Sequence, residues 1–267
     1  SSRRRHTRCS RDWSSDVVFF RSTSPHKGIN ALYAANLGLM AINSIRETFR
    51  EEECIRVHPI ITKGGDIVNV IPGDVRMETF VRGKTLRDML LAAIRVDRAL
   101  VGGAAAMGAM VEIEDLPGYL PAVYDEGLRA IAKEVGLMLV SEAEMAEDEH
   151  DTGSTDWGDI SSLMPVLETS IAGITGTAHG ADYKIADPDI AYVLGAKYLA
   201  SMAAELLLDE GAKAKGVLDV FRPLFASKQD YFDMADKLFR KRLLPEAGYQ
   251  DRTMEQLAAE LTDASFR

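Results

Sequence analysis

The 267-residue sequence has only two cysteines, few aromatic residues (7%) and no apolar run near the about 20 residues that span a bilayer. Cys9 and Cys54 have neither metal-site spacing nor the density of a disulfide-rich fold, so we expect a reducing cytoplasm. The G-x-S-x-G, H-E-x-x-H and Walker patterns are also absent, which leaves serine hydrolases, zincins and P-loop proteins without support.

Basic residues are also fewer than acidic ones. Lys and Arg together number 31 against 41 Asp and Glu, giving a formal net charge of −10. Such a balance argues against general binding to nucleic acid or to an anionic membrane. Because 46% of the residues are apolar, the chain can bury a core. We therefore expect a soluble, acidic enzyme with no nucleic-acid and no membrane partner.

Residues 1–16 differ in composition from the rest, with five arginines and two aspartates. Three interpretations are open: a nucleic-acid-binding arm, a targeting peptide, or a segment foreign to the protein. No apolar stretch follows the arginines, which argues against a secretory signal. The stretch resembles the conceptual translation of sequencing-adapter DNA. We therefore expect residues 1–21 to be an artefactual or disordered segment, with the protein entering mid-gene.

The spacing of apolar residues predicts the elements that follow. Three-and-four spacing predicts helices over residues 28–50 and 84–110, and alternation predicts strands from residue 55, over 75–82 and over 110–116. This order is a split βαβ layer without its first strand, for which residues 17–20 are a candidate. The glycines at 102, 103 and 108 lack the preceding strand of a phosphate loop and favour close helix packing.

Beyond residue 116 we expect helices. One covers residues 123–136, and a second begins at Asp187 as N-cap with Pro188 at its first position and stops at Gly211. Residues 212–267 are interpreted as appended helices, one of which starts at a capping box from Ser227 to Asp230.

Two segments could bind an anion. Asn69 and Arg82, expected on neighbouring strands, can together hold a carboxylate; the alternative is a turn asparagine and a solvated arginine. The stretch GSTDWGDISSLMP, residues 153–165, can present backbone N–H groups to an anion or use Asp156 and Asp159 as acceptors. Its alternative is an ordinary turn before a helix.

His179 stands within GTAHGADY, framed by small residues. No other histidine pairs with it at metal-site spacing. The residues alone leave two alternatives open, a metal ligand and a hydrogen-bonded structural histidine.

Four motifs occur in an order that resembles a known family: PHKGINALYAANLGLMAIN, HPIITKGGDIVNVIPGDVRMETFVRG, GSTDWGDIS and GTAHGADY. Over about residues 24–210 the sequence resembles the metal-dependent amidohydrolases of the aminoacylase and carboxypeptidase superfamily, in particular the hippurate hydrolase and aminobenzoyl-glutamate hydrolase branch. The resemblance implies a mixed α/β and α+β fold: a partial zinc-peptidase-like α/β catalytic domain with an inserted ferredoxin-like (split βαβ) lid. Accordingly, residues 22–116 would be the lid and dimerisation domain, 117–210 the C-terminal part of the catalytic domain, and 211–267 a helical C-terminal extension.

The resemblance also implies a site. His179 becomes a ligand of a dinuclear zinc centre, in which manganese or cobalt can replace zinc. Asn69 and Arg82 become the lid residues that reach the substrate's carboxylate, often across the dimer. Gly153, Ser154, Thr155 and Asp156 line the pocket. The remaining ligands and the general-base glutamate lie in a first half that this chain does not contain, so the catalytic residues are unknown.

The expected function is therefore that of a fragment of a metal-dependent amidohydrolase, inactive by itself. Its parent would hydrolyse the amide bond of N-acyl amino acids or of small peptides with a terminal carboxylate, as a homodimer formed through the lid. The alternative is a non-catalytic dimerisation or binding module derived from such an enzyme. A nucleic-acid binder acting through the arginine stretch is opposed by the acidic body.

Overall fold

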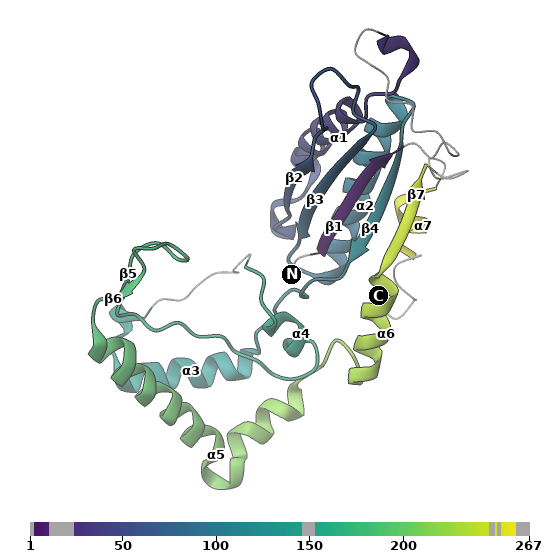
Figure 1. Ribbon diagram of the computed structural model, residues 1–267. Helices are drawn as coiled ribbons and strands as arrows, with labels where there is room; N and C mark the ends of the chain where they lie inside the picture. The colour runs from purple at the N-terminus through teal and green to yellow at the C-terminus, as the bar shows by residue number, and fades with distance from the viewer. Residues whose placement is uncertain (1–2, 11–23, 146–152, 246–248, 250–251, 260–267) are drawn as a thin grey trace. The chain divides into compact units, whose positions relative to one another are not determined.

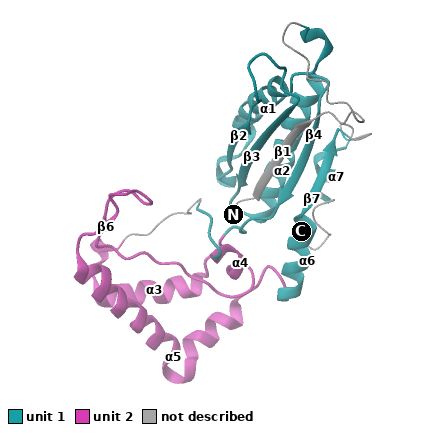
Figure 2. Ribbon diagram, in the orientation of Figure 1, with its two compact units in different colours: residues 1–121, 152–156, 227–267 teal, residues 122–151, 157–226 magenta. Residues whose placement is uncertain are grey.

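The computed structural model describes residues 3–10, 24–145, 153–245, 249 and 252–259. The chain divides into two compact units, shown in Figure 2. Unit 1 comprises Ser1–Pro121, Thr152–Asp156 and Ser227–Arg267, and unit 2 comprises Ala122–Asp151 and Trp157–Ala226.

Unit 1 is built on one five-stranded antiparallel sheet with the strand order β2-β3-β1-β4-β7. Its strands are β1 (Arg3–Ser10), β2 (Arg56–Lys63), β3 (Asp74–Arg82), β4 (Met110–Leu116) and β7 (Arg240–Leu244). Helices α1 (Ala31–Ile45) and α2 (Leu86–Ala106) pack against each other and against one face of the sheet (Figure 1). The first six elements form the ferredoxin-like arrangement that the sequence predicts.

The alternation of β3 explains which face the helices cover. Val75, Met77, Thr79 and Val81 are at most 2% exposed, whereas Arg76 and Phe80 are exposed on the other side. Because successive strand residues point to opposite faces, the first set lies under the helices and the second on an open face. The predicted strand is confirmed residue by residue.

The two helices touch at glycines. A Cβ atom on Gly103 would lie 2.3 Å from the backbone nitrogen of Gly38, so α1 and α2 approach backbone to backbone at this point. Gly102 has nothing within 4 Å of such an atom. The predicted close packing is confirmed at Gly103, and Gly108, at a φ of +68°, lies just after the end of α2.

The first strand comes from a segment expected to be disordered. Arg3–Ser10 forms β1 and pairs with β3 from Arg3↔Val81 to Ser10↔Asp74, and also with β4. An eight-residue stretch without proline or glycine can hydrogen-bond on both sides, and it fills the gap between the two strands. Residues 17–20, the candidate for this strand, lie outside the described residues.

The C-terminal part of unit 1 corrects the expectation of a purely helical extension. Helix α6 (Lys228–Leu238) starts as predicted, with the Ser227 hydroxyl accepting from the Asp230 backbone N–H at 3.2 Å. Residues Arg240–Leu244 instead form β7, which pairs with β4, and α7 (Met254–Ala259) follows. The strand was missed because its inward positions 240 and 242 are arginines, which break the usual apolar alternation.

Unit 2 is mainly helical. It contains α3 (Glu126–Leu139), α4 (Trp157–Ser161), a hairpin of β5 (Ile174–Thr175) and β6 (Lys184–Ile185), a π-helical turn (Asp189–Leu194) and α5 (Gly195–Val220). Helix α3 begins where the Asp125 carboxylate accepts from the Leu128 N–H at 2.9 Å. Its core joins α3 to α5 through Ile131, Ala132, Val135, Tyr198 and Val217.

The helical segment from Asp187 has the predicted cap, but Gly211 marks a break rather than the predicted end. The Asp187 carboxylate accepts from the Asp189 and Ile190 N–H groups at 3.0 and 3.1 Å. The helix breaks at residues 208–211, where Asp209, Glu210 and Gly211 have positive φ, and it resumes to Val220. The segment Asp189–Val220 is long and apolar enough by composition to cross a membrane. The break and its acidic residues argue against a spanning helix.

Candidate metal and substrate site

His179 lies at the tip of the β5–β6 hairpin, in a loop over residues 176–183 (Figure 1). The loop is tied together by short hydrogen bonds: Gly180 N–H donates to the Thr177 carbonyl at 2.7 Å, and Thr177 N–H to the Asp182 carboxylate at 3.2 Å. Gly176 has a φ of +97°, and a Cβ there would lie 2.3 Å from the Asp182 carbonyl oxygen. Glycine is therefore required at this position, which is why the motif has this composition.

The His179 backbone is left-handed, with a φ of 63°, and the side chain is exposed. Among the residues that the structure describes, none forms a hydrogen bond with the imidazole. A buried, hydrogen-bonded structural role does not fit this geometry. The hairpin instead presents an exposed imidazole.

The described residues do not by themselves form a metal centre. Within the described part of the chain, no group of three or more His, Cys, Asp or Glu side chains could hold an ion. Structural and catalytic zinc sites use three or four protein ligands. The described residues therefore give His179 no set of companion ligands, and no reaction step can be derived from them.

Asn69 and Arg82 are not brought together within one chain. Asn69 is exposed in the turn that precedes β3, next to a Val70 N–H to Ile67 carbonyl hydrogen bond of 3.2 Å. Arg82 is the last residue of β3, with its guanidinium 6.0 Å from the centre of the Phe80 ring. The strand between them spans about 26 Å at about 3.3 Å per residue. The expected placement on neighbouring strands is therefore wrong for a single protomer.

Residues 153–156 belong to unit 1 and run directly into α4, which belongs to unit 2. Gly153, Thr155 and Asp156 are exposed. The Ser154 hydroxyl oxygen is buried and has no hydrogen-bond partner among the described residues. A buried hydroxyl without a partner is unusual in a folded protein.

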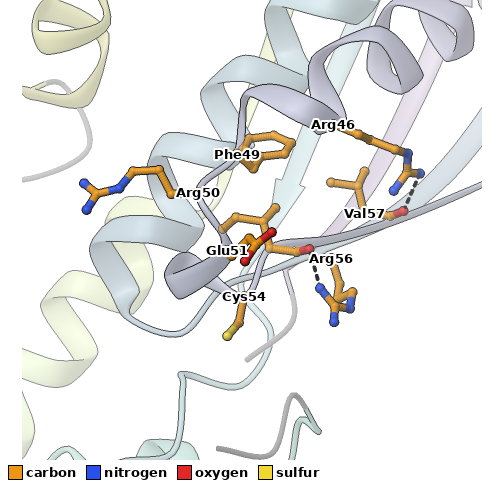
Figure 3. A pocket seen from close by; sticks show the side chains of 8 residues that line it. Arg46, Phe49, Arg50, Glu51, Cys54, Arg56 and Val57 are labelled. Carbon is orange, nitrogen blue, oxygen red and sulfur yellow. Dashed lines mark hydrogen bonds between the residues drawn. The ribbon is translucent and has the colours of Figure 1, made fainter.

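A hollow of about 200 Å³ lies where α1 leads into β2 (Figure 3). Arg46 and Arg56 are at its border, and each donates to a backbone carbonyl, of Val57 at 2.9 Å and Ile55 at 3.0 Å. Ligand sites usually measure about 300–1,000 Å³. None of the predicted site residues lines this hollow, so it is not a candidate for the substrate site.

The fold is shared with known peptidases and amidohydrolases. A Staphylococcus aureus protein assigned as an aminohydrolase aligns with a TM-score of 0.59 and 16% identity, over 76% of this chain and 50% of that one. Aminopeptidase PepT from Bacillus cereus aligns with a TM-score of 0.57 and 14% identity, over 77% and 52%. Bacillus subtilis YxeP, a dinuclear metal-binding peptidase of the M20 family, aligns with a TM-score of 0.53 and 19% identity, over 77% and 49%. The chain has the M20 peptidase fold.

Two curated relatives agree with this class. The Xaa-Arg dipeptidases of Mus musculus and Homo sapiens are 27% and 28% identical over 150 and 151 residues. Each alignment covers 53% of this chain and 33% of the relative. No family model matches. The resemblance to metal-dependent amidohydrolases and peptidases is confirmed, and the chain spans a third of these relatives' length.

Proposed function

We propose that this chain is part of a metal-dependent amidohydrolase that cleaves the amide bond of N-acyl amino acids or small peptides with a free terminal carboxylate. One observation carries the proposal: an exposed imidazole, His179, at the tip of a tightly bonded hairpin in a chain with the M20 fold. The description of YxeP as a dinuclear metal-binding peptidase supports a pair of divalent ions. Zinc is the ion proposed, with manganese or cobalt as substitutes.

In this proposal His179 supplies one ligand and residues outside the described part supply the others. A single imidazole cannot hold two ions in place. The chain alone is therefore expected to be inactive. The apolar side chains exposed along α5, among them Leu199 (65%) and Leu207 (74%), would pack against the rest of the catalytic domain. We place the enzyme in the cytoplasm.

The lid would form a homodimer through β2. This strand ends the sheet, and Ile60 and Ile61 are 60% and 39% exposed on it. An exposed edge strand pairs readily with another copy, and a two-fold axis makes the two strands antiparallel. The end of one β2 would then lie beside the start of the other. That arrangement carries Asn69 of the partner subunit towards Arg82, so one carboxylate can meet both.

A non-catalytic dimerisation or binding module remains the second candidate, because the described residues hold no metal cluster. The two candidate functions can be distinguished by an experiment. This chain is joined to the missing part of the catalytic domain, recovered from the source gene. We expect metal-dependent hydrolysis of an N-acyl amino acid and dipeptide panel. The variant His179→Ala should lose at least about a hundredfold in kcat/KM, and His26→Ala, at another exposed histidine, should not. A joined protein that folds and binds no metal would favour the module.

A further inference from the structure

The loop between β2 and β3 has an apolar tip. Val68 is fully exposed and Ile67 is 63% exposed. The tip is held in a turn, because the Val70 N–H donates to the Ile67 carbonyl at 3.2 Å. Two apolar side chains held in solvent at the end of a loop indicate a contact with another molecule.

The base of this loop is anchored to its own unit. The Pro72 carbonyl accepts from the Ala31 N–H at 2.9 Å, and the Lys63 ammonium lies 3.3 Å from the Asp66 carboxylate. A Cβ atom on Gly65 would lie 3.1 Å from the Pro72 ring, so the two arms of the loop touch. The loop therefore projects its tip in a fixed direction.

The hollow of Figure 3 lies at the opposite end of β2. Phe49, Ile55 and Val57 give it an apolar wall, and Cys54 also lines it. Its volume of about 200 Å³ is below the usual range of small-molecule sites. Because a water molecule takes about 30 Å³ of liquid volume, the hollow still has room for an aliphatic side chain.

The charges of the hollow and of the loop are complementary. Three arginines line the hollow together with one carboxylate: Arg46, Arg50, Arg56 and Glu51. The loop carries Asp66, whose side chain is 65% exposed, directly before the tip. An acidic group beside an apolar tip matches an apolar hollow with a basic border.

A two-fold axis brings the tip and the hollow together. In a dimer through β2, the two copies of the strand run antiparallel. An axis beside Ile61 leaves six residues to Ile55 in one direction and six to Ile67 in the other. Within one chain, tip and hollow lie at opposite ends of the eight-residue strand. The tip of one copy therefore meets the hollow of the other, and the contact forms twice.

We propose that the tip of each protomer, Ile67 and Val68, inserts into the hollow at the start of the partner's β2. The choice of a second copy as the partner rests on the dimer of the proposed function, whereas metal binding and hydrolysis are not needed for it. The two reciprocal contacts set the offset between the paired strands. Asn69 follows the tip directly and takes its position from them.

Cys54 allows a direct test, because it is a free thiol that lines the hollow. In the full 267-residue chain, Val68→Cys should form a disulfide with Cys54 of the partner subunit on mild oxidation, which requires Cβ atoms about 3.5–4.5 Å apart. Electrophoresis without reductant would show twice the chain mass, and peptide mass mapping would locate the bond between positions 54 and 68. Adding Cys54→Ser should abolish this bond. Leu243→Cys, at the other edge of the sheet, should form no bond to position 54.

Val68→Lys tests the same contact without a cross-link. The lysine would be placed against the arginines of the hollow, so the dissociation constant of the dimer should rise at least about tenfold. Val68 is fully exposed within one protomer, so the substitution should leave the protomer folded. Light scattering over a dilution series measures the dissociation, and Leu243→Lys is the matched control that should behave like the parent chain.

Two results would overturn the inference alone: a dimeric protein in which positions 54 and 68 do not cross-link, or a Val68→Lys variant that dimerises like the parent chain. A monomeric parent chain would contradict the β2 dimer and the inference with it. Failure of hydrolysis in the joined enzyme, by contrast, would contradict only the proposed activity.

Discussion

The guanidinium of Arg242 lies 2.9 Å from the carboxylate of Asp97, a residue 145 positions earlier in the chain, and 2.8 Å from that of Asp115. The two carboxylates are 1% and 0% exposed. Burial by itself lowers the pKa of Arg242, but Asp97 and Asp115 outweigh it and raise the pKa above its usual value. The pairs hold β7 against α2 and β4.

Arg242→Ala should therefore lower the free energy of unfolding by about 3 kcal/mol, because it removes a buried positive charge that both Asp97 and Asp115 contact. Lys241→Ala is the matched control, since its ion pair with Glu112 at 3.1 Å is on the exposed side of the same strand. We expect a change below about 1 kcal/mol there. Urea unfolding measures both, and equal losses in the two variants would contradict the buried-pair account.

The glycine contact between α1 and α2 gives a second prediction. Gly103→Ala places a methyl group against the Gly38 backbone and should destabilise the protein by about 1–3 kcal/mol. Gly102→Ala meets open space and should gain up to about 1 kcal/mol from helix propensity. Opposite signs for neighbouring glycines are the expected result of denaturant titration. The packing account would be wrong if both variants were stabilised.

The ion pairs of Lys213 in α5 should make the stability of the fold depend on pH. Its ammonium lies 2.7 Å from both Glu134 of α3 and Glu205, and these hydrogen bonds raise its pKa from 10.5 to about 12. A pKa raised on folding means that the contribution to stability is complete below the unfolded value and is lost as the pH rises through about 12.

The Lys213→Met variant should accordingly be less stable than the parent chain near neutral pH, with a difference that shrinks as the pH approaches about 12. Lys215→Met, at an exposed lysine of the same helix, should show no such convergence. Unfolding midpoints across the alkaline range provide the measurement. A constant difference for Lys213→Met would show that the ion pairs do not stabilise the fold.

The proposed dimer predicts that the two edges of the sheet respond differently. A lysine on an edge strand opposes strand pairing. Ile60→Lys on β2, 60% exposed, should shift the molar mass from two chains to one in light scattering after size exclusion. Leu243→Lys on β7, 40% exposed at the other edge, should remain dimeric. If only Leu243→Lys disrupted the dimer, the interface would lie at β7, and the proposed β2 interface would be wrong.

Much of the sheet and helices of unit 1 could be predicted because their signals are local. In β3 the buried positions alternate with charged residues and Phe80, and the N-cap of α2 is Thr85, whose hydroxyl accepts from the Asp88 N–H at 3.1 Å. Strand β7 escaped prediction because the groups that Arg240 and Arg242 neutralise lie on distant elements. Strands are predicted from alternating apolar residues, so a strand whose inward-facing residues are charged is not detected.

The candidate site residues were proposed from residue type, and the sequence did not give their geometry. The glycines around His179 indicate a tight loop, but β5 and β6 have two residues each, too few for a strand pattern. The strand predicted over residues 75–82 separates Asn69 from Arg82, and the expectation of neighbouring strands was wrong because Asn69 lies in the turn before β3. The position of Arg56 opposite Arg82 could not be predicted, because it depends on the register of β2 against β3.

The most direct test of the account is the metal content of the joined enzyme, measured by mass spectrometry after removal of free metal. We expect two divalent ions per chain in the parent protein and in His26→Ala, and no more than one in His179→Ala. Two ions per chain in all three proteins would show that the hairpin imidazole is not a ligand, and the account of this chain as part of a two-metal amidohydrolase site would be wrong.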